Sequence, residues 1–285
     1  MNRIILSIAI AVSLFSCETV VTDDLNLSQS EPILVVEGGI EHYNDGTPSL
    51  QQVRLTTTTD FLENGPPPIV ENAVVTLNTP QGVYPLAYVG EGFYRTTDIQ
   101  AVVGENYELV IAWEGKQYTA NDRLVEEPAI DSIYTEFEEE TGITDEGYFV
   151  KINSQDPVDI PNFYHYRVYR NNELIVIPDP GNARTIILND EFFDGENRVG
   201  VNPNEEAILE VGDSVLVEQI GISETYYDFL FELYTLTGNQ GLSFTGNPPP
   251  ASIGGNIQSQ EPLQYKALGF FSVIDIKRKS ILVVE

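Results

Sequence analysis

The 285-residue sequence contains a single cysteine, Cys17, and this scarcity excludes several kinds of chemistry. A chain with one thiol forms no internal disulfide and builds no cysteine-rich metal site. Histidine is nearly as rare, and neither His42 nor His165 lies in a metal-ligand spacing such as His-Glu-x-x-His. The Gly-x-Ser-x-Gly segment of serine hydrolases and the Gly-x-x-x-x-Gly-Lys phosphate loop are both missing. The motifs therefore predict no catalytic residues and no cofactor.

Positive charge is also scarce. The chain has 14 lysines and arginines against 44 aspartates and glutamates, which gives a formal net charge of −30 at pH 7. Nucleic acid is excluded as a partner, because so few cations cannot neutralise a phosphate backbone. The same charge disfavours lying flat on an anionic membrane. Since 42% of the residues are hydrophobic, the chain can nevertheless bury a large core.

Long apolar runs are absent after an N-terminal stretch at residues 4–15. This stretch follows Arg3 and is shorter than the roughly 20 residues that a transmembrane helix needs, so residues 1–16 are predicted to be an export signal. Leu14-Phe15-Ser16-Cys17 resembles the bacterial lipobox, in which the cysteine is lipidated and becomes the first mature residue. The alternatives are an ordinary secretory signal with a chance cysteine, or a buried free thiol.

Residues 17–30 are polar and are predicted to be a tether between the lipid and a folded body. Their acidic residues resemble the export tag of Bacteroidota surface lipoproteins. Together, the lipobox and the tag predict a protein that is lipid-anchored in the outer membrane and faces the cell surface. Two or three acyl chains, each contributing ~0.8 kcal/mol per buried CH₂, would hold it there.

Residues 31–127 are predicted to form an immunoglobulin-like β-sandwich, because short alternating segments are separated by turn residues. Asn44-Asp45-Gly46, Gly90-Glu91-Gly92 and Glu114-Gly115-Lys116 have the composition of tight turns. The hydrophobic spacing also resembles a transthyretin-like module. The expected strands are residues 32–40, 51–60, 73–78, 83–89, 92–96, 107–113 and 116–124.

Residues 128–285 are predicted to form a second β-rich domain, fibronectin-like, with one inserted helix. The helix is expected at residues 223–237, with Ser223 as its N-cap and Gly238 just beyond its end. Its apolar surface is wider than one stripe, so it is either sandwiched in the fold or docked on a partner. The expected strands are residues 130–137, 148–154, 163–170, 184–189, 208–220 and 267–273.

The C-terminal third combines a Tyr/Phe-rich helix, Asn247-Pro248-Pro249-Pro250, Gly255-Asn256-Ile257 and Leu268-Gly269-Phe270-Phe271-Ser272. With the lipobox, this order resembles a Bacteroidota outer-membrane lipoprotein family of unknown function, typically encoded beside TonB-dependent transporters. The resemblance implies such a transporter as partner. Asn247, Pro248, Pro249 and Asn256 are then candidate partner-binding residues, although prolines and glycines can also simply shape a loop against the core.

One acidic segment groups oxygen donors around a glycine turn, as calcium loops do. Asp190, Asp194 and Glu196 are its candidate ligands. The segment lacks the Asp-x-Asp-x-Asp-Gly order and the distal bidentate glutamate, so a solvated acidic loop is the alternative.

Three functional hypotheses follow. The first is a non-enzymatic surface lipoprotein that assists a TonB-dependent outer-membrane transporter in nutrient uptake. The second is a stand-alone glycan-binding or adhesion module, using the acidic surface or the 15 tyrosines. The third is a hydrolase whose carboxylates meet only in the folded chain.

Overall fold

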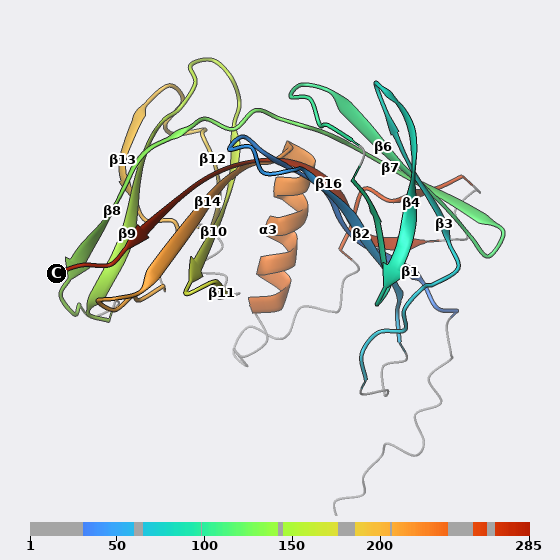
Figure 1. Ribbon diagram of the computed structural model, residues 1–285, viewed down its shortest axis with the longest axis horizontal. Helices are drawn as coiled ribbons and strands as arrows, with labels where there is room; N and C mark the ends of the chain where they lie inside the picture. The colour runs from blue at the N-terminus through green and yellow to red at the C-terminus, as the bar shows by residue number, and fades with distance from the viewer. Residues whose placement is uncertain are drawn as a thin grey trace, which may run out of the picture. The chain divides into compact units, whose positions relative to one another are not determined.

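The computed structural model describes residues 31–59, 65–97, 99–141, 145–175, 186–205, 207–238, 253–260 and 266–285 (Figure 1). The described residues are mostly β, as predicted. The strands are β1 (Leu34–Tyr43), β2 (Leu50–Thr57), β3 (Val74–Thr79), β4 (Gly82–Gly90), β5 (Phe93–Thr96), β6 (Asn106–Trp113), β7 (Lys116–Arg123), β8 (Ile130–Glu138), β9 (Gly147–Gln155), β10 (Phe163–Arg170), β11 (Glu173–Ile175), β12 (Ile187–Asn189), β13 (Asn197–Val201), β14 (Ser214–Gly221), β15 (Gln258–Ser259) and β16 (Ala267–Leu282), and the helix is α3 (Glu224–Gly238).

The strands pair into two sheets. Thirteen strands form one sheet in the order β11-β10-β14-β16-β1-β2-β5-β4-β3-β6-β7-β15, with β12 paired to β10. The second sheet has the order β13-β9-β8. The alternation of apolar and polar residues in the sequence matches the alternation of buried and more exposed side chains. In β6, Tyr107, Leu109, Ile111 and Trp113 are buried while the residues between them are more exposed. One face of this strand therefore belongs to the core.

Tight turns join the strands where the sequence predicts them. Glu91 and Glu114 have φ values of 52° and 48°, and Gly92 and Gly115 follow them at 81° and 72°. Two consecutive residues with positive φ give the backbone twist that a two-residue hairpin needs.

Strand β16 is an interior strand of the larger sheet and lies between β14 and β1 (Figure 1). It pairs in parallel with β1, from Leu34 opposite Ala267 to Tyr43 opposite Ile276, and antiparallel with β14 on its other side. Its side chains enter all three hydrophobic clusters: Phe271 in the first, Ile281 against the second and Ile274 in the third. The predicted division at residue 128 stays a prediction, and the final strand packs with both halves.

Helix α3 begins and ends close to the prediction. Ser223 Oγ accepts a hydrogen bond from Tyr226 N at 3.3 Å, as an N-cap does. Leu230 is buried in the third cluster, whereas Phe231 is exposed. One side of the helix therefore packs on the sheet. Among the described residues, no helix combines the length and apolarity that crossing a membrane requires.

The structure corrects several predicted strands. Residues 208–213 precede β14 rather than belong to it, because Gly212 takes a φ of 99° and Asp213 Oδ2 accepts from Glu210 N in a turn. Strand β16 continues to Leu282, well past the predicted end, because β14 pairs with its polar second half. Strands β11, β13 and β15 were not predicted; each is short and lacks clear alternation.

Candidate functional site

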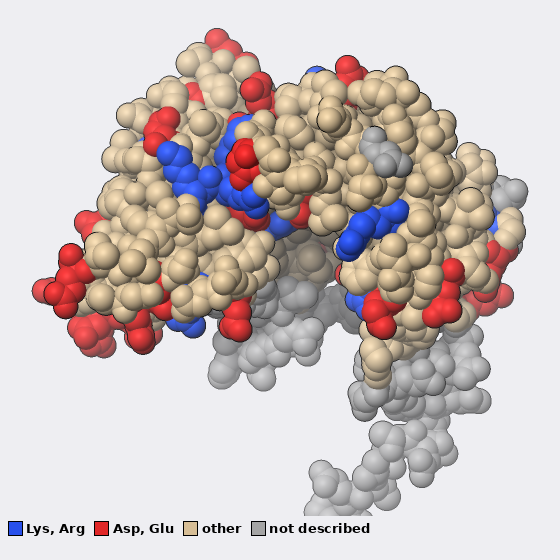
Figure 2. All heavy atoms as spheres, viewed as in Figure 1, with Lys and Arg blue, Asp and Glu red and all other residues tan. Residues whose placement is uncertain are grey.

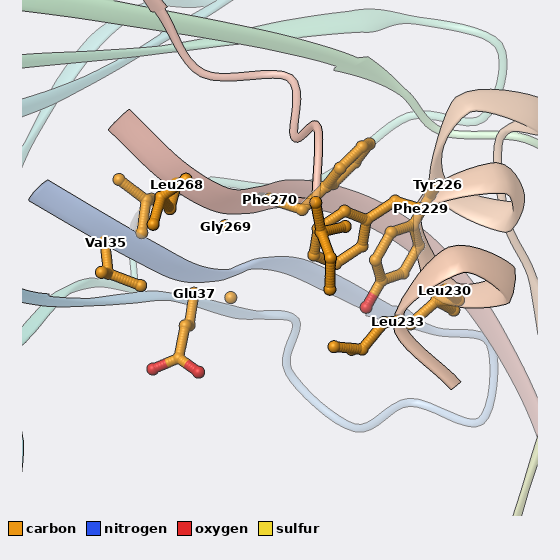
Figure 3. Close-up of a pocket in the computed structure, with 12 residues that line it drawn as sticks. Val35, Glu37, Tyr226, Phe229, Leu230, Leu233, Leu268, Gly269 and Phe270 are labelled. Carbon is orange, nitrogen blue, oxygen red and sulfur yellow. The ribbon is translucent and has the colours of Figure 1, made fainter. Parts of the chain in front are cut away.

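An apolar groove lies between helix α3 and strands β1 and β16, and we call it the helix groove. Its volume is about 490 Å³. Figure 3 shows Tyr226, Phe229 and Phe270 grouped at one end and Val35 and Leu268 at the other, with the Glu37 carboxylate pointing away from both groups. The Phe270 ring centroid lies 4.7 Å from that of Tyr226 and 5.2 Å from that of Phe229. These rings give one wall a rigid aromatic surface.

Glycines let three backbone segments meet at the helix groove. An added Cβ on Gly269, whose φ is 90°, would lie 2.0 Å from Val36 O. An added Cβ on Gly255 would lie 1.6 Å from Gly269 O. No larger residue fits either position without moving the backbone.

Asn256 holds the neighbouring segment in place. Its Nδ2 donates to Asn121 O at 3.0 Å and to Phe271 O at 2.8 Å, and its Oδ1 accepts from Phe271 N at 3.0 Å. The side chain thus clamps residues 253–260 onto β7 and β16. Asn247, Pro248 and Pro249, the other predicted partner-binding residues, lie outside the described residues, as does Cys17. The lipid attachment remains a prediction.

A second cavity, of about 870 Å³, lies where residues 124–129 connect β7 to β8, and we call it the junction cleft. The loop at residues 157–163, the start of α3 and Lys277 also line it. Half of the lining residues are aliphatic or proline, and Phe163 is the aromatic one. Such a cavity has the size and lining typical of small-molecule sites.

Behind the junction cleft, Asp275 organises a buried polar network. Its carboxylate accepts from Glu127 N at 2.9 Å, from His42 Nδ1 at 2.7 Å and from Lys277 Nζ at 2.9 Å, and also from Asn44 Nδ2. Burial acts to raise the pKa of Asp275, but these hydrogen bonds outweigh it and hold the pKa below its usual value. Asp275 is therefore a charged anchor that fixes the β7–β8 connection to β16.

Arg198 occupies the space between the two sheets. It is 7% exposed, donates to Tyr166 OH at 2.9 Å and to Ser154 Oγ at 2.6 Å, and lies 4.0 Å from the centroid of the Tyr164 ring. Hydrogen bonds and a cation–π contact together stabilise this buried guanidinium.

The predicted calcium residues are partly brought together. Asp190 and Asp194 join Asp156, which was not predicted, and one ligand atom of each lies within 4.8 Å of the others. Glu196 is not in the group. Burial is the main reason that the pKa of Asp190 is raised. Calcium binding remains a prediction.

Backbone N–H groups occupy one oxygen of each of these carboxylates. Gly195 N donates to Asp156 at 2.9 Å, Asn162 N to Asp190 at 2.8 Å and Asp159 N to Asp194 at 2.9 Å. The three acids therefore fasten two loops together, with or without an ion.

Asp275 belongs to no recognised motif, yet the sequence around it indicates that it is important. Asp275 interrupts the apolar run from Phe270 to Ile276, and a lone acid on a buried strand requires hydrogen-bond partners. Glu127 and Asp156 carry no comparable local signal, because their burial depends on segments distant in the chain.

Residues 20–280 match a family described as a domain of unknown function, DUF4249. A search of curated proteins finds no match. The matched segment includes every residue of both cavities.

Proposed function

Because the chain belongs to the DUF4249 family, whose description assigns no activity, we propose its function from the residues themselves. It is a non-enzymatic, lipid-anchored protein of the outer-membrane surface that binds a TonB-dependent transporter and assists nutrient uptake. The anchor is Cys17, at the end of the lipobox-like segment. Of the two cavities, the helix groove is the surface that contacts the transporter.

One observation carries this proposal. The segments whose order resembles transporter-associated lipoproteins are separate pieces of the C-terminal third, and those that the structure describes meet at the helix groove. Tyr226 and Phe229 come from α3, Phe270 from β16, and Asn256 clamps the segment between them. A rigid aromatic surface of this kind is typical of protein interfaces.

Acidic side chains are spread over the face seen in Figure 2, whereas lysines and arginines gather in fewer places. With a net charge of −30, the body is repelled by anionic lipid headgroups. This supports a protein held away from the bilayer by its tether and attracted to another protein by shape and apolar contact.

A photo-crosslinking experiment tests the proposal. A benzophenone amino acid replaces Glu37, which is exposed at the helix groove, and in a control replaces Glu114, which is exposed in the β6–β7 turn. Irradiated cells should give a crosslinked TonB-dependent transporter, identified by mass spectrometry, from position 37 and not from position 114. Equal crosslinking from both positions, or none to a transporter, would contradict the proposal.

Two further measurements address the anchor and the alternative. Mass spectrometry of the mature N-terminus should find acylated Cys17, and Cys17→Ala should move the protein out of the membrane fraction. Glycan binding without any transporter crosslink would instead favour a stand-alone adhesion module.

A further inference from the structure

Strand β8 is an edge of the smaller sheet. It pairs with β9 on one side, and no other strand among the described residues pairs with its second side. It is nine residues long, whereas the strands at the other three ends of the two sheets, β13, β11 and β15, are shorter. An edge strand presents unpaired backbone N–H and C=O groups to any extended chain beside it. Strand β8 is therefore the longest terminal edge at which this fold can accept a further strand.

The register of the β8–β9 pair shows which backbone groups point outward. Tyr148, opposite Phe137, exchanges both of its backbone hydrogen bonds with Leu209 on the far side of β9, at 3.3 Å and 2.9 Å. Tyr148 and Phe137 are therefore a non-hydrogen-bonded pair, and the N–H and C=O of Phe137 point away from β9. Because the pattern alternates along the strand, the backbone groups of Ile133 and Thr135 point the same way.

We call the outward backbone groups of Ile133, Thr135 and Phe137 the open edge. The residue before them on this side, Asp131, is already engaged, because its C=O accepts a hydrogen bond from Lys279 Nζ at 2.9 Å. The open edge itself has no backbone partner among the described residues. The side chain of Ile133 packs against the second hydrophobic cluster and holds the strand in place. An extended partner therefore need not order this strand on binding.

The side chains along the open edge indicate the chemistry of a partner. Phe137 is 52% exposed and Tyr134 is 36% exposed, and alternation places them on opposite faces of the strand. Glu136 is exposed on the Tyr134 face and has no ion-pair partner among the described residues. Glu139 and Glu140 follow the strand directly and are also exposed. The open edge thus combines unpaired backbone groups, exposed aromatic side chains and uncompensated negative charge.

A second copy of this chain does not fit the open edge. Pairing of two β8 strands would bring the glutamates of one copy beside those of the other, and like charges opposite one another destabilise a strand pair. Each copy also carries a net charge of −30. The acidic side chains therefore protect the edge from self-pairing and leave it available to a strand of opposite charge.

We propose that β8 binds an extended basic segment of another protein, which adds as a strand to the edge of the three-stranded sheet. Hydrogen bonds from the backbone of the segment to the open edge give affinity. Lysine or arginine side chains at alternate positions face Glu136, and apolar side chains at the positions between them cover Phe137. This site is separate from the helix groove and does not depend on the transporter proposal.

Fluorescence anisotropy on the full chain in a non-ionic detergent tests the site. The probe is a labelled peptide of alternating lysine and valine, about as long as β8. A lysine–proline peptide has the same charge but cannot add to a sheet, because proline has no N–H group. A glutamate–valine peptide keeps the strand pattern and reverses the charge. At about 0.15 M salt, which screens charges beyond about 8 Å, we expect the lysine–valine peptide to bind at least about tenfold more tightly than either control.

Amide hydrogen exchange followed by NMR shows whether the peptide adds as a strand. Saturating lysine–valine peptide should slow exchange at the amides of Ile133, Thr135 and Phe137, which face the open edge. The amides of Tyr134 and Glu136 face β9 and should change little by comparison. A general attraction of the peptide to the acidic surface would not produce this alternating pattern.

Variants locate the binding. Thr135→Pro removes one outward N–H without removing a β8–β9 hydrogen bond, and it should weaken binding of the lysine–valine peptide at least about fivefold. Glu136→Lys should weaken that peptide about fivefold and strengthen the glutamate–valine peptide, so it tests the site even if Thr135→Pro fails to fold. Glu114→Lys makes the same charge change in the exposed β6–β7 turn and should alter either affinity less than about twofold.

Four results would overturn the inference. The lysine–valine peptide could fail to bind at millimolar concentration, or the lysine–proline peptide could bind as tightly, which would reduce the attraction to charge alone. Exchange at the three outward amides could stay unchanged at saturation, which would place the peptide elsewhere. Finally, sedimentation could show that the chain self-associates and that Thr135→Pro abolishes this, which would make a second copy the occupant of the open edge.

Discussion

Asp275 is fully buried and accepts hydrogen bonds from three strands or loops of the chain, so its charge is central to local stability. Asp275→Asn removes that charge and turns an NH₂ group toward donors. We expect the free energy of unfolding to fall by about 3 kcal/mol, since the change breaks a buried ionic network. Urea unfolding at pH 7 measures this. Asp131→Asn, on the exposed side of β8, should change stability by less than about 0.5 kcal/mol.

The pKa of Asp122 is shifted in the opposite direction from that of Asp275, because burial raises it to about 6. Its carboxyl group accepts from Val273 N at 2.7 Å. Above its unfolded pKa of about 3.9, the native state holds a proton that the unfolded state has lost, so stability falls as pH rises toward 6. Asp122→Asn cannot ionise and should lack this fall.

The comparison needs only two pH values. Between pH 5 and pH 7, the wild type should lose about 1 kcal/mol of stability relative to Asp122→Asn. Urea unfolding of both proteins at each pH gives the difference. A difference in unfolding free energy between the two proteins that stays constant from pH 5 to pH 7 would contradict the assignment of the raised pKa to Asp122.

At the scale of elements, the contact between residues 253–260 and β16 depends on one of two adjacent glycines. An added Cβ on Gly255 would lie 1.6 Å from Gly269 O, whereas one on Gly254 would meet nothing within 4 Å. Gly255→Ala should therefore destabilise this contact by about 3 kcal/mol or more, because backbone must move. Gly254→Ala is the control and should change stability by less than about 0.5 kcal/mol.

Hydrogen exchange localises this effect. Phe271 N donates to Asn256 Oδ1 at 3.0 Å, so its amide should exchange faster in Gly255→Ala if the segment detaches. Unchanged exchange in both variants would mean that the sheet absorbs the added methyl group.

The sequence predicted elements better than it predicted their partners. Strands such as β6 and β10 could be found because alternation with a period of two is a local property. The pairing of β1 with β16 could not, because nothing near Leu34 indicates that Ala267 lies beside it. The acidic group shows the same limit: Asp190 and Asp194 are neighbours in sequence, but Asp156 joins them only through the fold.

At the scale of the whole molecule, a protein made of residues 31–127 alone would lack strand β16. Phe271 and Val273 belong to the same hydrophobic cluster as the strands of that segment, and Val273 N donates to Asp122. Without β16, strand β1 would also present an unpaired edge along its length. We therefore expect a protein made of residues 31–127 alone to unfold without a cooperative transition.

Restoring the strand should restore the fold. A peptide of residues 266–285, added in trans or fused through a flexible linker, should give the 31–127 segment a cooperative thermal transition and dispersed amide NMR signals. A peptide with the same composition in scrambled order is the control, because it keeps the hydrophobicity but loses the alignment with β1. If residues 31–127 instead melt cooperatively on their own, the first half is an independent domain and β16 merely docks on it. If only the correctly ordered peptide restores the transition, the two ends of the chain fold as one unit, and the cavities that border β16 form only when the last strand is in place.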